Sequence, residues 1–151
     1  MIGEKEFVEG DALHERRDFK AAFDVFQKGA DMGHGACMSR LAEMYNSGEH
    51  VDQDYKKALD WHKRASKGGE PCFLRSVANT YRLMGNMANY KIWLERAYAG
   101  GDGEAALQLA ELYMVSDKEF ETIKKYLEAA INSESICEED VDEAKSLLEK
   151  L

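Results

Sequence analysis

Apolar residues recur along this chain with helical spacing, and the same short pattern returns four times. An aromatic residue stands three or four positions ahead of a small one in each case. The four sites are Phe26 before Gly29-Ala30, Trp61 before Ala65, Trp93 before Ala97 and Tyr126 before Ala129-Ala130. Their aromatic residues lie 35, 32 and 33 positions apart by subtraction. Fixed self-similarity in this range is typical of a solenoid, in which each unit stacks on its neighbours.

A second pattern precedes each of the last three sites and predicts a partner helix. It consists of a large residue, a small residue and, three positions later, a tyrosine. The three copies are Leu41-Ala42 with Tyr45, Val77-Ala78 with Tyr81 and Leu109-Ala110 with Tyr113. The large residue and the tyrosine share one helical face because residues four apart lie above each other. The small residue lets the two helices of a pair approach closely.

Turn and capping residues set the expected helix ends. Glycines follow the second helices, Pro71 suits the first turn of a helix, and Asp18, Asp54 and Asp117 are candidate N-caps. The predicted helices are 4–15, 18–31, 36–47, 53–67, 71–84, 87–99, 103–115, 117–131 and 138–150. The last has an apolar stripe opposite an acidic face, as a terminal cap requires.

These patterns predict an all-α fold of one domain over residues 1–151. We expect an α/α solenoid of about four helix-turn-helix repeats with a C-terminal capping helix. The expected repeats are 4–33, 34–69, 70–101 and 102–132, and the cap is 138–151. The scarcity of proline and of alternating β-branched runs supports this fold class.

Charge and composition narrow the partners. The formal net charge is −9 at pH 7, which disfavours nucleic acid because phosphate binding depends on Lys and Arg. A basic protein surface would be attracted by this field, although acidity also serves solubility alone. No run approaches the roughly 20 apolar residues that span a bilayer, and the charged N-terminal residues 1–6 show no secretory signal. With three cysteines and no CxxC spacing, a cytoplasmic protein with reduced thiols is expected.

Catalytic and metal-binding signatures are missing from the sequence. It contains no GxSxG, glycine-rich phosphate loop or HExxH, and its four histidines have no ligand-like spacing. We therefore expect no catalytic residues, no metal and no cofactor, and we interpret the histidines as surface residues, with His62 pointing away from the core. Cys37 and Cys72 lie 35 residues apart, which predicts equivalent positions filled for small-residue packing.

Residues 36–69 resemble a Sel1-like repeat. The matching positions are Leu41-Ala42, Tyr45, Gly48, Val51, Asp54, Lys57-Ala58, Trp61, Arg64-Ala65 and Gly68. Only this unit has the longer connection between helices, over residues 47–54. The other units look like the shorter, related tetratricopeptide repeat, as in Gly10 to Leu13 and Phe26 to Ala30. The resemblance implies a module that binds proteins or peptides and has no catalytic machinery.

The tetratricopeptide geometry implies which residues line the concave side. They are Ser39, Glu43 and Asn46, then Arg75, Asn79 and Arg82, then Leu107, Glu111 and Met114. Arg75 and Arg82 flank an asparagine, and two guanidinium groups could hold a carboxylate or a peptide backbone. An ordinary solvated groove is the alternative for each of these residues.

Three functions remain open at this point. The first is a non-enzymatic module that binds a protein or peptide partner, possibly a basic one, through its helical surface. The second is an immunity or antitoxin-type inhibitor whose acidic surface neutralises a basic bacterial effector. An enzyme is the third, because functional sites can be grafted on any fold. The partner's identity and the oligomeric state do not follow from the sequence.

Overall fold

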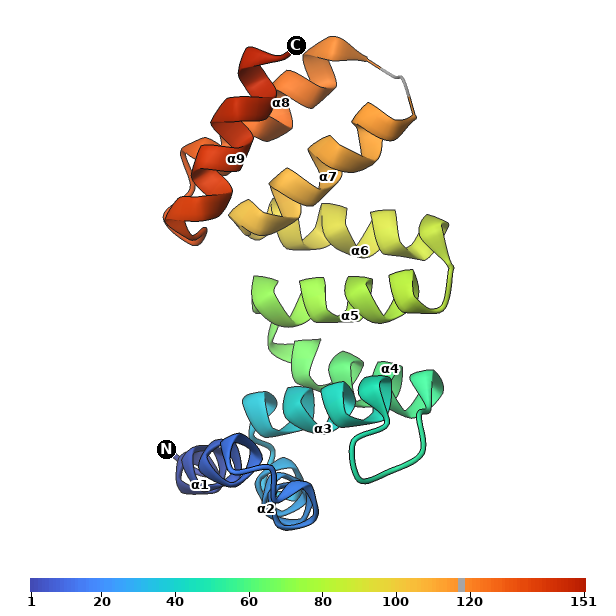
Figure 1. Ribbon diagram of the computed structural model, residues 1–151, viewed down its shortest axis with the longest axis vertical. Coiled ribbons are helices and arrows are strands. Elements are labelled where there is room, and N and C mark those ends of the chain that lie inside the picture. The colour runs from blue at the N-terminus through green and yellow to red at the C-terminus, as the bar shows by residue number, and fades with distance from the viewer. Residues whose placement is uncertain (117–118) are drawn as a thin grey trace.

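The computed structural model describes residues 1–116 and 119–151, and these residues form helices connected by short loops (Figure 1). The helices are α1 (Glu4–Glu15), α2 (Phe19–Asp31), α3 (Gly35–Ser47), α4 (Tyr55–Ala65), η1 (Ser66–Gly68), α5 (Pro71–Leu83), α6 (Met87–Ala99), α7 (Gly103–Val115), α8 (Phe120–Ile131) and α9 (Glu138–Glu149). The predicted all-α fold class is confirmed. Helix ends agree with prediction to within two residues, apart from the start of α8, which was expected at 117, outside the described residues.

Side-chain caps fix where several helices begin. The carboxylate of Asp18 accepts a hydrogen bond from the Ala21 amide, and that of Asp54 accepts from Lys56 and Lys57, as predicted. Asp117, the third predicted cap, lies outside the described residues. Three further caps were not predicted: His34, Asn86 and Asp102.

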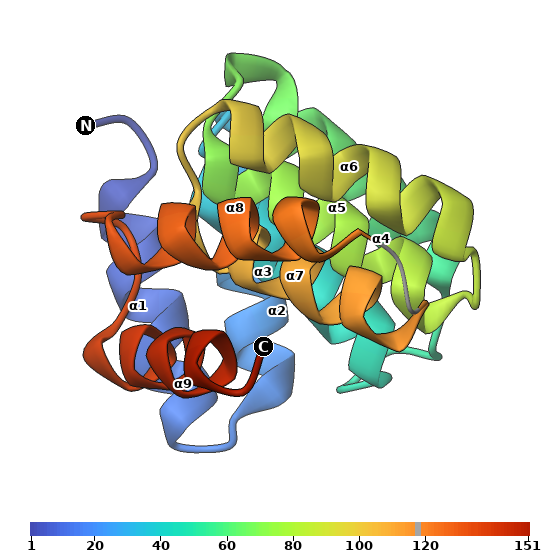
Figure 2. The same ribbon diagram turned by 90° about the horizontal axis from the view of Figure 1, so that it is seen from above.

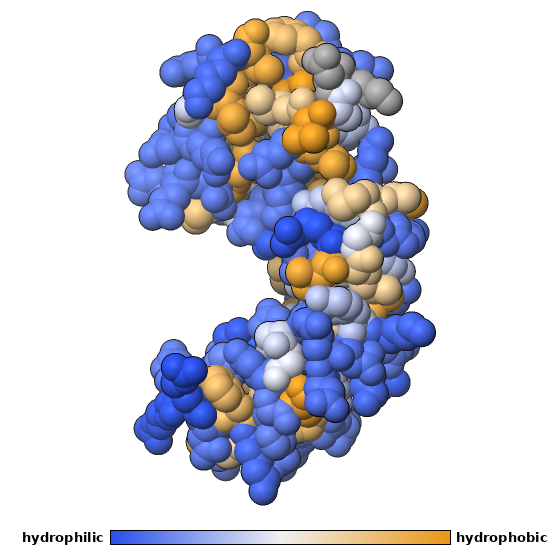
Figure 3. Space-filling model, turned by 45° about the vertical axis from the view of Figure 1, so that its right-hand side comes forward, coloured by the Kyte–Doolittle hydropathy of each residue, from blue (hydrophilic) through white to orange (hydrophobic). Residues whose placement is uncertain are grey.

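The helices pack in chain order, each mainly against its predecessor and its successor. The resulting stack curves, so that α1 and α9 lie at opposite ends and project to the same side (Figures 1 and 2). A hollow separates the two ends, and hydrophilic residues border much of it (Figure 3). The first helices α3 and α5 lie on the side of this hollow, whereas α4 and α6 lie on the outer side (Figure 2).

The buried apolar side chains form two clusters rather than one. The first consists of Ala22, Phe26, Ala30, Cys37, Leu41 and Met44 of α2 and α3, and Phe7 and Leu13 of α1 and Trp61 of α4 pack against it. The second continues from Ala78 in α5 through α6, α7 and α8 to Ala144 in α9. Helices α4 and α5, which pack against each other, carry buried residues that belong to neither cluster: the apolar Ala58, Ala65 and Val77 and the polar His62 and Thr80, whose side chains are in contact. The junction of the two clusters therefore contains a buried polar pair, His62 and Thr80, which we call the polar layer.

The repeated tryptophans lie at the edge of the core. Both rings are half-buried and pack against the apolar clusters. The guanidinium of Arg64 lies 4.8 Å from the centre of the Trp61 ring, and that of Arg96 lies 4.5 Å from Trp93. An arginine three positions later thus covers each ring, which is a favourable cation–π arrangement.

Within the described residues, none of the helices is both long enough and apolar enough to cross a membrane.

Helices α1 and α2 approach each other closely at Gly10 of α1, where there is no room for a side chain. A Cβ atom added at Gly10 would collide with the ring of Phe26, which is fully buried. We expect Gly10→Ala to lower the free energy of unfolding by about 1–3 kcal/mol, because overpacking outweighs the gain in helix propensity of about 1 kcal/mol. Urea denaturation followed by circular dichroism measures the change.

Gly68 provides the matched control, since a Cβ atom there meets nothing within 4 Å and its backbone does not require glycine. Gly68→Ala should leave the stability unchanged or slightly higher. Equal stability of Gly10→Ala and the wild type would show that α1 and α2 do not pack as described.

Candidate binding groove

Three equivalent positions on successive first helices present polar side chains. Glu43 of α3, Asn79 of α5 and Glu111 of α7 are all exposed. In each helix the large-small pair just before this residue is fully buried: Leu41-Ala42, Val77-Ala78 and Leu109-Ala110. Each first helix therefore packs one side into the stack and presents the other as part of a row, which we call the first-helix face.

Two residues expected on this face are not exposed. Ser39 is 8% exposed and Leu107 is 5% exposed, so their predicted place on an open surface is wrong. Leu107 is part of the second apolar cluster, and the backbone of Ser39 lies against His62. The neighbouring helices of the stack approach α3 and α7 closely enough to cover Ser39 and Leu107. Arg82 is exposed, whereas Asn46 and Met114 are half-buried.

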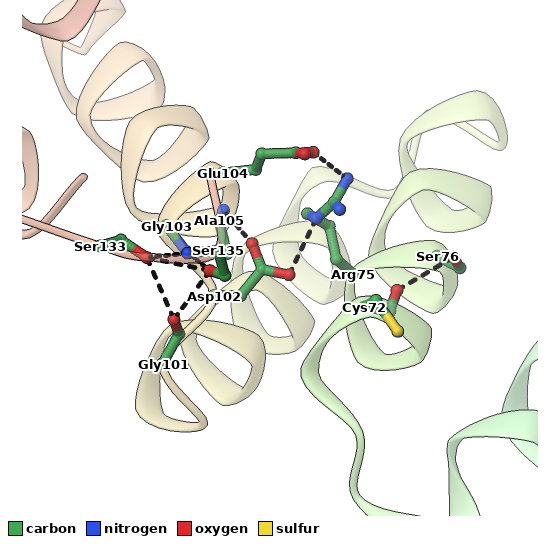
Figure 4. A network of polar contacts seen from close by, with 10 residues as sticks. All are labelled: Cys72, Arg75, Ser76, Gly101, Asp102, Gly103, Glu104, Ala105, Ser133 and Ser135. Carbon is green, nitrogen blue, oxygen red and sulfur yellow. Dashed lines mark hydrogen bonds and ion pairs between the residues drawn. The ribbon is translucent and has the colours of Figure 1, made fainter. Parts of the chain in front are cut away.

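Arg75 is held by acidic residues of the chain itself (Figure 4). Its Nε donates to Asp102 Oδ2 over 3.0 Å, and its Nη1 pairs with Glu104. Asp102 also caps α7 by accepting from the Ala105 amide at 2.8 Å. The predicted clamp, in which Arg75 and Arg82 hold a partner carboxylate, is therefore not available at Arg75. Arg82 instead donates to Asn79 Oδ1 at 2.8 Å.

A second arginine is held in the same way on the neighbouring helix. Arg40 of α3 donates through Nε to Asp11 of α1 at 2.9 Å and through Nη1 to Glu43 at 3.0 Å. Both arginines tie one first helix to the next, and each is paired with two carboxylates. Each of these clusters, Asp11–Arg40–Glu43 and Arg75–Asp102–Glu104, therefore carries a formal net charge of −1.

Acidic residues of the capping helix extend the negative charge. Although Glu111 is exposed, nearby protein atoms partly desolvate its carboxyl group and raise its pKa, and Glu143 and Asp140 of α9 raise this pKa further. Helix α9 contacts α7, which places these two acidic side chains near Glu111. The C-terminal part of the first-helix face is therefore acidic as well.

His62 is buried, at 1% exposure, and the prediction that it points away from the core is wrong. Its Nδ1 lies within hydrogen-bond distance of Thr80 Oγ1, at 3.0 Å, and Thr80 Oγ1 accepts a hydrogen bond from Asn46 Nδ2 at 3.1 Å. Burial lowers the pKa of His62 to about 4, an effect that the Ser39 carbonyl partly opposes. The imidazole is consequently neutral at physiological pH.

A comparison of the repeats could have revealed this buried histidine. His62 directly follows Trp61, just as Leu94 follows Trp93 and Leu127 follows Tyr126. Both leucines are fully buried. His62 thus occupies a core position that is leucine in the two following repeats. The prediction placed His62 outside the core because Trp61, the residue before it, was assigned to the core.

A cavity of about 230 Å³ opens beside this polar layer. Its lining comes from three successive first helices and from α4: Glu43, Asn46, His62, Arg75, Ser76, Asn79 and Gln108. Every residue in this lining is polar. A cavity with such a lining suits hydrogen-bonding groups rather than an apolar ligand.

The two cysteines are not equivalent, contrary to prediction. Cys37 is fully buried, where burial raises the pKa of its thiol to about 11, whereas Cys72 is exposed. The tyrosines of the same helices, Tyr45 and Tyr81, lie 36 residues apart, one more than the cysteines. One residue turns a helix by about 100°, so Cys72 lies on another face.

Comparisons with known proteins agree with this architecture. Residues 7–34 and 35–70 match the model of the Sel1 repeat, which confirms the resemblance of the second unit. The match over residues 7–34 corrects the prediction for the first unit, which was expected to resemble the tetratricopeptide repeat. No curated protein matches the sequence.

Among solved structures, a Sel1 repeat protein from Oxalobacter formigenes is similar with a TM-score of 0.75 and 21% identity. The match covers 94% of this chain, which spans only 58% of that protein. An immunity protein from Pseudomonas aeruginosa matches with a TM-score of 0.43 and 14% identity, over 94% of this chain and 81% of the other. This similarity is too low to support a shared function, so the immunity hypothesis stays a prediction.

Replacement of His62 by leucine tests how much the buried polar side chain lowers the free energy of unfolding. Above pH 6.5 we expect His62→Leu to raise the free energy of unfolding by about 1 kcal/mol, because an unpaired buried group is removed. As the pH falls from 6.5 towards 4, the unfolded state of the wild type binds a proton that the folded state does not. Wild-type stability therefore falls over that window by up to about 3 kcal/mol, a loss that the variant avoids.

Urea titrations of both proteins above pH 6.5 and near pH 4.5 measure this difference. The stability gap should widen on acidification. A gap that does not change with pH would mean that His62 is solvated rather than buried in the folded state.

Proposed function

We propose that this chain, an α-solenoid that carries two Sel1 repeats, is a non-enzymatic module that binds a protein partner along its first-helix face. The resemblance to Sel1-like and tetratricopeptide repeats implies this class of function. One observation on the chain itself supports it above the others: Glu43, Asn79 and Glu111 lie exposed in a row on three successive helices.

The row has the properties of a surface that the fold itself does not require. The buried pairs beside these residues already fix the packing of each first helix. The exposed side chains can therefore be chosen for a partner without loss of the stack. Helices repeated side by side also provide an extended surface, which suits a peptide segment or the flank of a protein better than a small molecule.

Electrostatics favour a basic partner for this face. The clusters around Arg40 and Arg75 each carry a formal net charge of −1, and Glu111 adds to them. Together with the net charge of −9, this field would attract a positively charged surface and speed its association. The effect should weaken at high ionic strength.

A pair of charge-matched variants tests the proposal. Glu43→Lys with Glu111→Lys reverses the charge of the first-helix face, whereas Asp24→Lys with Glu121→Lys makes the same change on exposed second-helix positions. Affinity capture from the source organism, followed by quantitative mass spectrometry, compares both with the wild type. We expect at least one partner protein that still binds the second-helix variant (Asp24→Lys with Glu121→Lys) and no longer binds the first-helix variant (Glu43→Lys with Glu111→Lys).

The purified partner should then bind the first-helix variant at least about tenfold more weakly in calorimetry. Unchanged melting temperatures would exclude a loss of folding. Equal retention, or equal loss, in the two variants would show that the first-helix face is not the binding surface.

A further inference from the structure

A cavity of about 740 Å³ lies where the connection from α2 to α3 and the connection from α4 to α5 come together. The end of α2 and the start of α3 line one part of it, and the end of α4, η1 and the start of α5 line another. Its lining contains none of Glu43, Asn79 and Glu111. A ligand in this cavity therefore need not touch the row that defines the first-helix face.

Apolar side chains supply much of the lining. Met32 is 48% exposed, and Met38 and Phe73 are half-buried. The Phe73 ring packs closely on Gly35, where an added Cβ atom would lie 2.9 Å from a ring carbon. This ring is thus fixed by packing, whereas the flexible thioether side chain of Met32 can adapt to an incoming group. Such a cavity suits a large aliphatic or aromatic side chain.

The charged residues of the lining are mainly basic. Arg64 and Lys67 are both exposed, and Glu70 is the one carboxylate that lines the cavity among the described residues. Arg64 Nη2 pairs with Asp60 at 3.1 Å, an exposed contact that leaves other donors of the guanidinium for a ligand. The ion pairs that lysines form within the described residues do not involve Lys67. With histidine counted as neutral, the lining carries a formal charge of +1 in a chain of −9.

The positive charge continues along α4 beyond the cavity. Residues 55–68 contain five cations and one carboxylate, which gives a formal charge of +4, so the rest of the chain carries −13 by subtraction. The five cations are all exposed: Lys56, Lys57, Lys63, Arg64 and Lys67. This segment attracts acidic groups. Nucleic acid fits less well than an acidic protein, because the rest of the chain repels phosphates and the apolar part of the cavity gives them no contact.

We propose that this cavity is a second docking site, which binds an acidic segment of a protein partner. A large apolar side chain of that segment occupies the cavity beside Met32 and Phe73, and neighbouring aspartate or glutamate carboxylates pair with Arg64 and Lys67. The inference goes beyond the proposed function, because the first-helix face is acidic and favours a basic partner. With both surfaces in use, the chain holds two partners of opposite charge together.

Selection of a random peptide library on the full chain tests this site. The selected peptides should include a group in which a large apolar residue stands next to aspartate or glutamate. Arg64→Glu with Lys67→Glu should weaken the binding of these acidic peptides at least about tenfold in calorimetry. Lys56→Glu with Lys57→Glu is the matched control, because it makes the same charge change at exposed positions of α4 outside the cavity. It should leave the affinity within about threefold of the wild type.

A pair of methionine variants tests the apolar contact. Met32 and Met84 each follow a helix with similar backbone angles and are 48% and 40% exposed, but only Met32 lines the cavity. Met32→Glu should weaken the binding of the acidic peptides at least about tenfold, whereas Met84→Glu should not. Both positions are exposed, so equal melting temperatures of the two variants and the wild type are expected and would exclude a loss of folding.

Three results would overturn this inference. The first is a selection that yields no acidic peptide, and the second is acidic peptides that bind Arg64→Glu with Lys67→Glu as tightly as the wild type. Both leave the proposed function intact, since Glu43→Lys with Glu111→Lys tests that function separately. The third is a dimer of the chain that competes with the acidic peptides and that Arg64→Glu with Lys67→Glu abolishes. Such a dimer would assign the cavity to a second copy of the chain.

Discussion

The structure depends on one constraint: no helix pair can bury its apolar side without the next pair. Each first helix places a large and a small residue, such as Leu41 and Ala42, into the stack, where both are fully buried. A single pair would leave this surface in water, at a cost of about 25 cal/mol for each Å² of apolar area. Stacking removes the cost at every junction, and α9 ends the series by burying Ala144 on the last pair. Small residues are needed because helix axes must come close.

The stack is not uniform, and its exception coincides with the candidate site. Between the two apolar clusters, α4 and α5 bury the polar pair His62 and Thr80 beside apolar residues such as Val77. Apolar side chains at these positions would join the clusters into one core. Two buried polar atoms here, Asn46 Oδ1 and His62 Nε2, have no hydrogen-bond partner within the described residues, and both residues line a polar cavity. Sites that lower stability without serving the packing are where function is expected, because proteins accept local cost for binding.

Much of the fold could be predicted because it repeats. The recurrence of Trp61, Trp93 and Tyr126 identified the second helices, and the residues Asp18 and Asp54 marked helix starts correctly. The site was less accessible to sequence reasoning. The exposure of Ser39 and Leu107 depends on how closely neighbouring pairs approach, which no local pattern encodes. Arg75 seemed free to bind a partner because Asp102 and Glu104, with which it pairs, lie on the next first helix and its N-cap, far away in sequence. The prediction for His62 was wrong because it relied on the adjacent Trp61, whereas the equivalent residues of the next two repeats, Leu94 and Leu127, indicate a buried position.

Native-state hydrogen exchange tests most directly whether a polar layer divides the core. If it does, the slowest amides of α1–α3 and those of α6–α8 should open as two separate units with different free energies. Amides at the junction of α4 and α5 should exchange through the less stable unit. A double replacement of His62 by leucine and Thr80 by valine should merge the two units into one. A single common free energy of opening in the wild type, with no change in the double variant, would contradict the account.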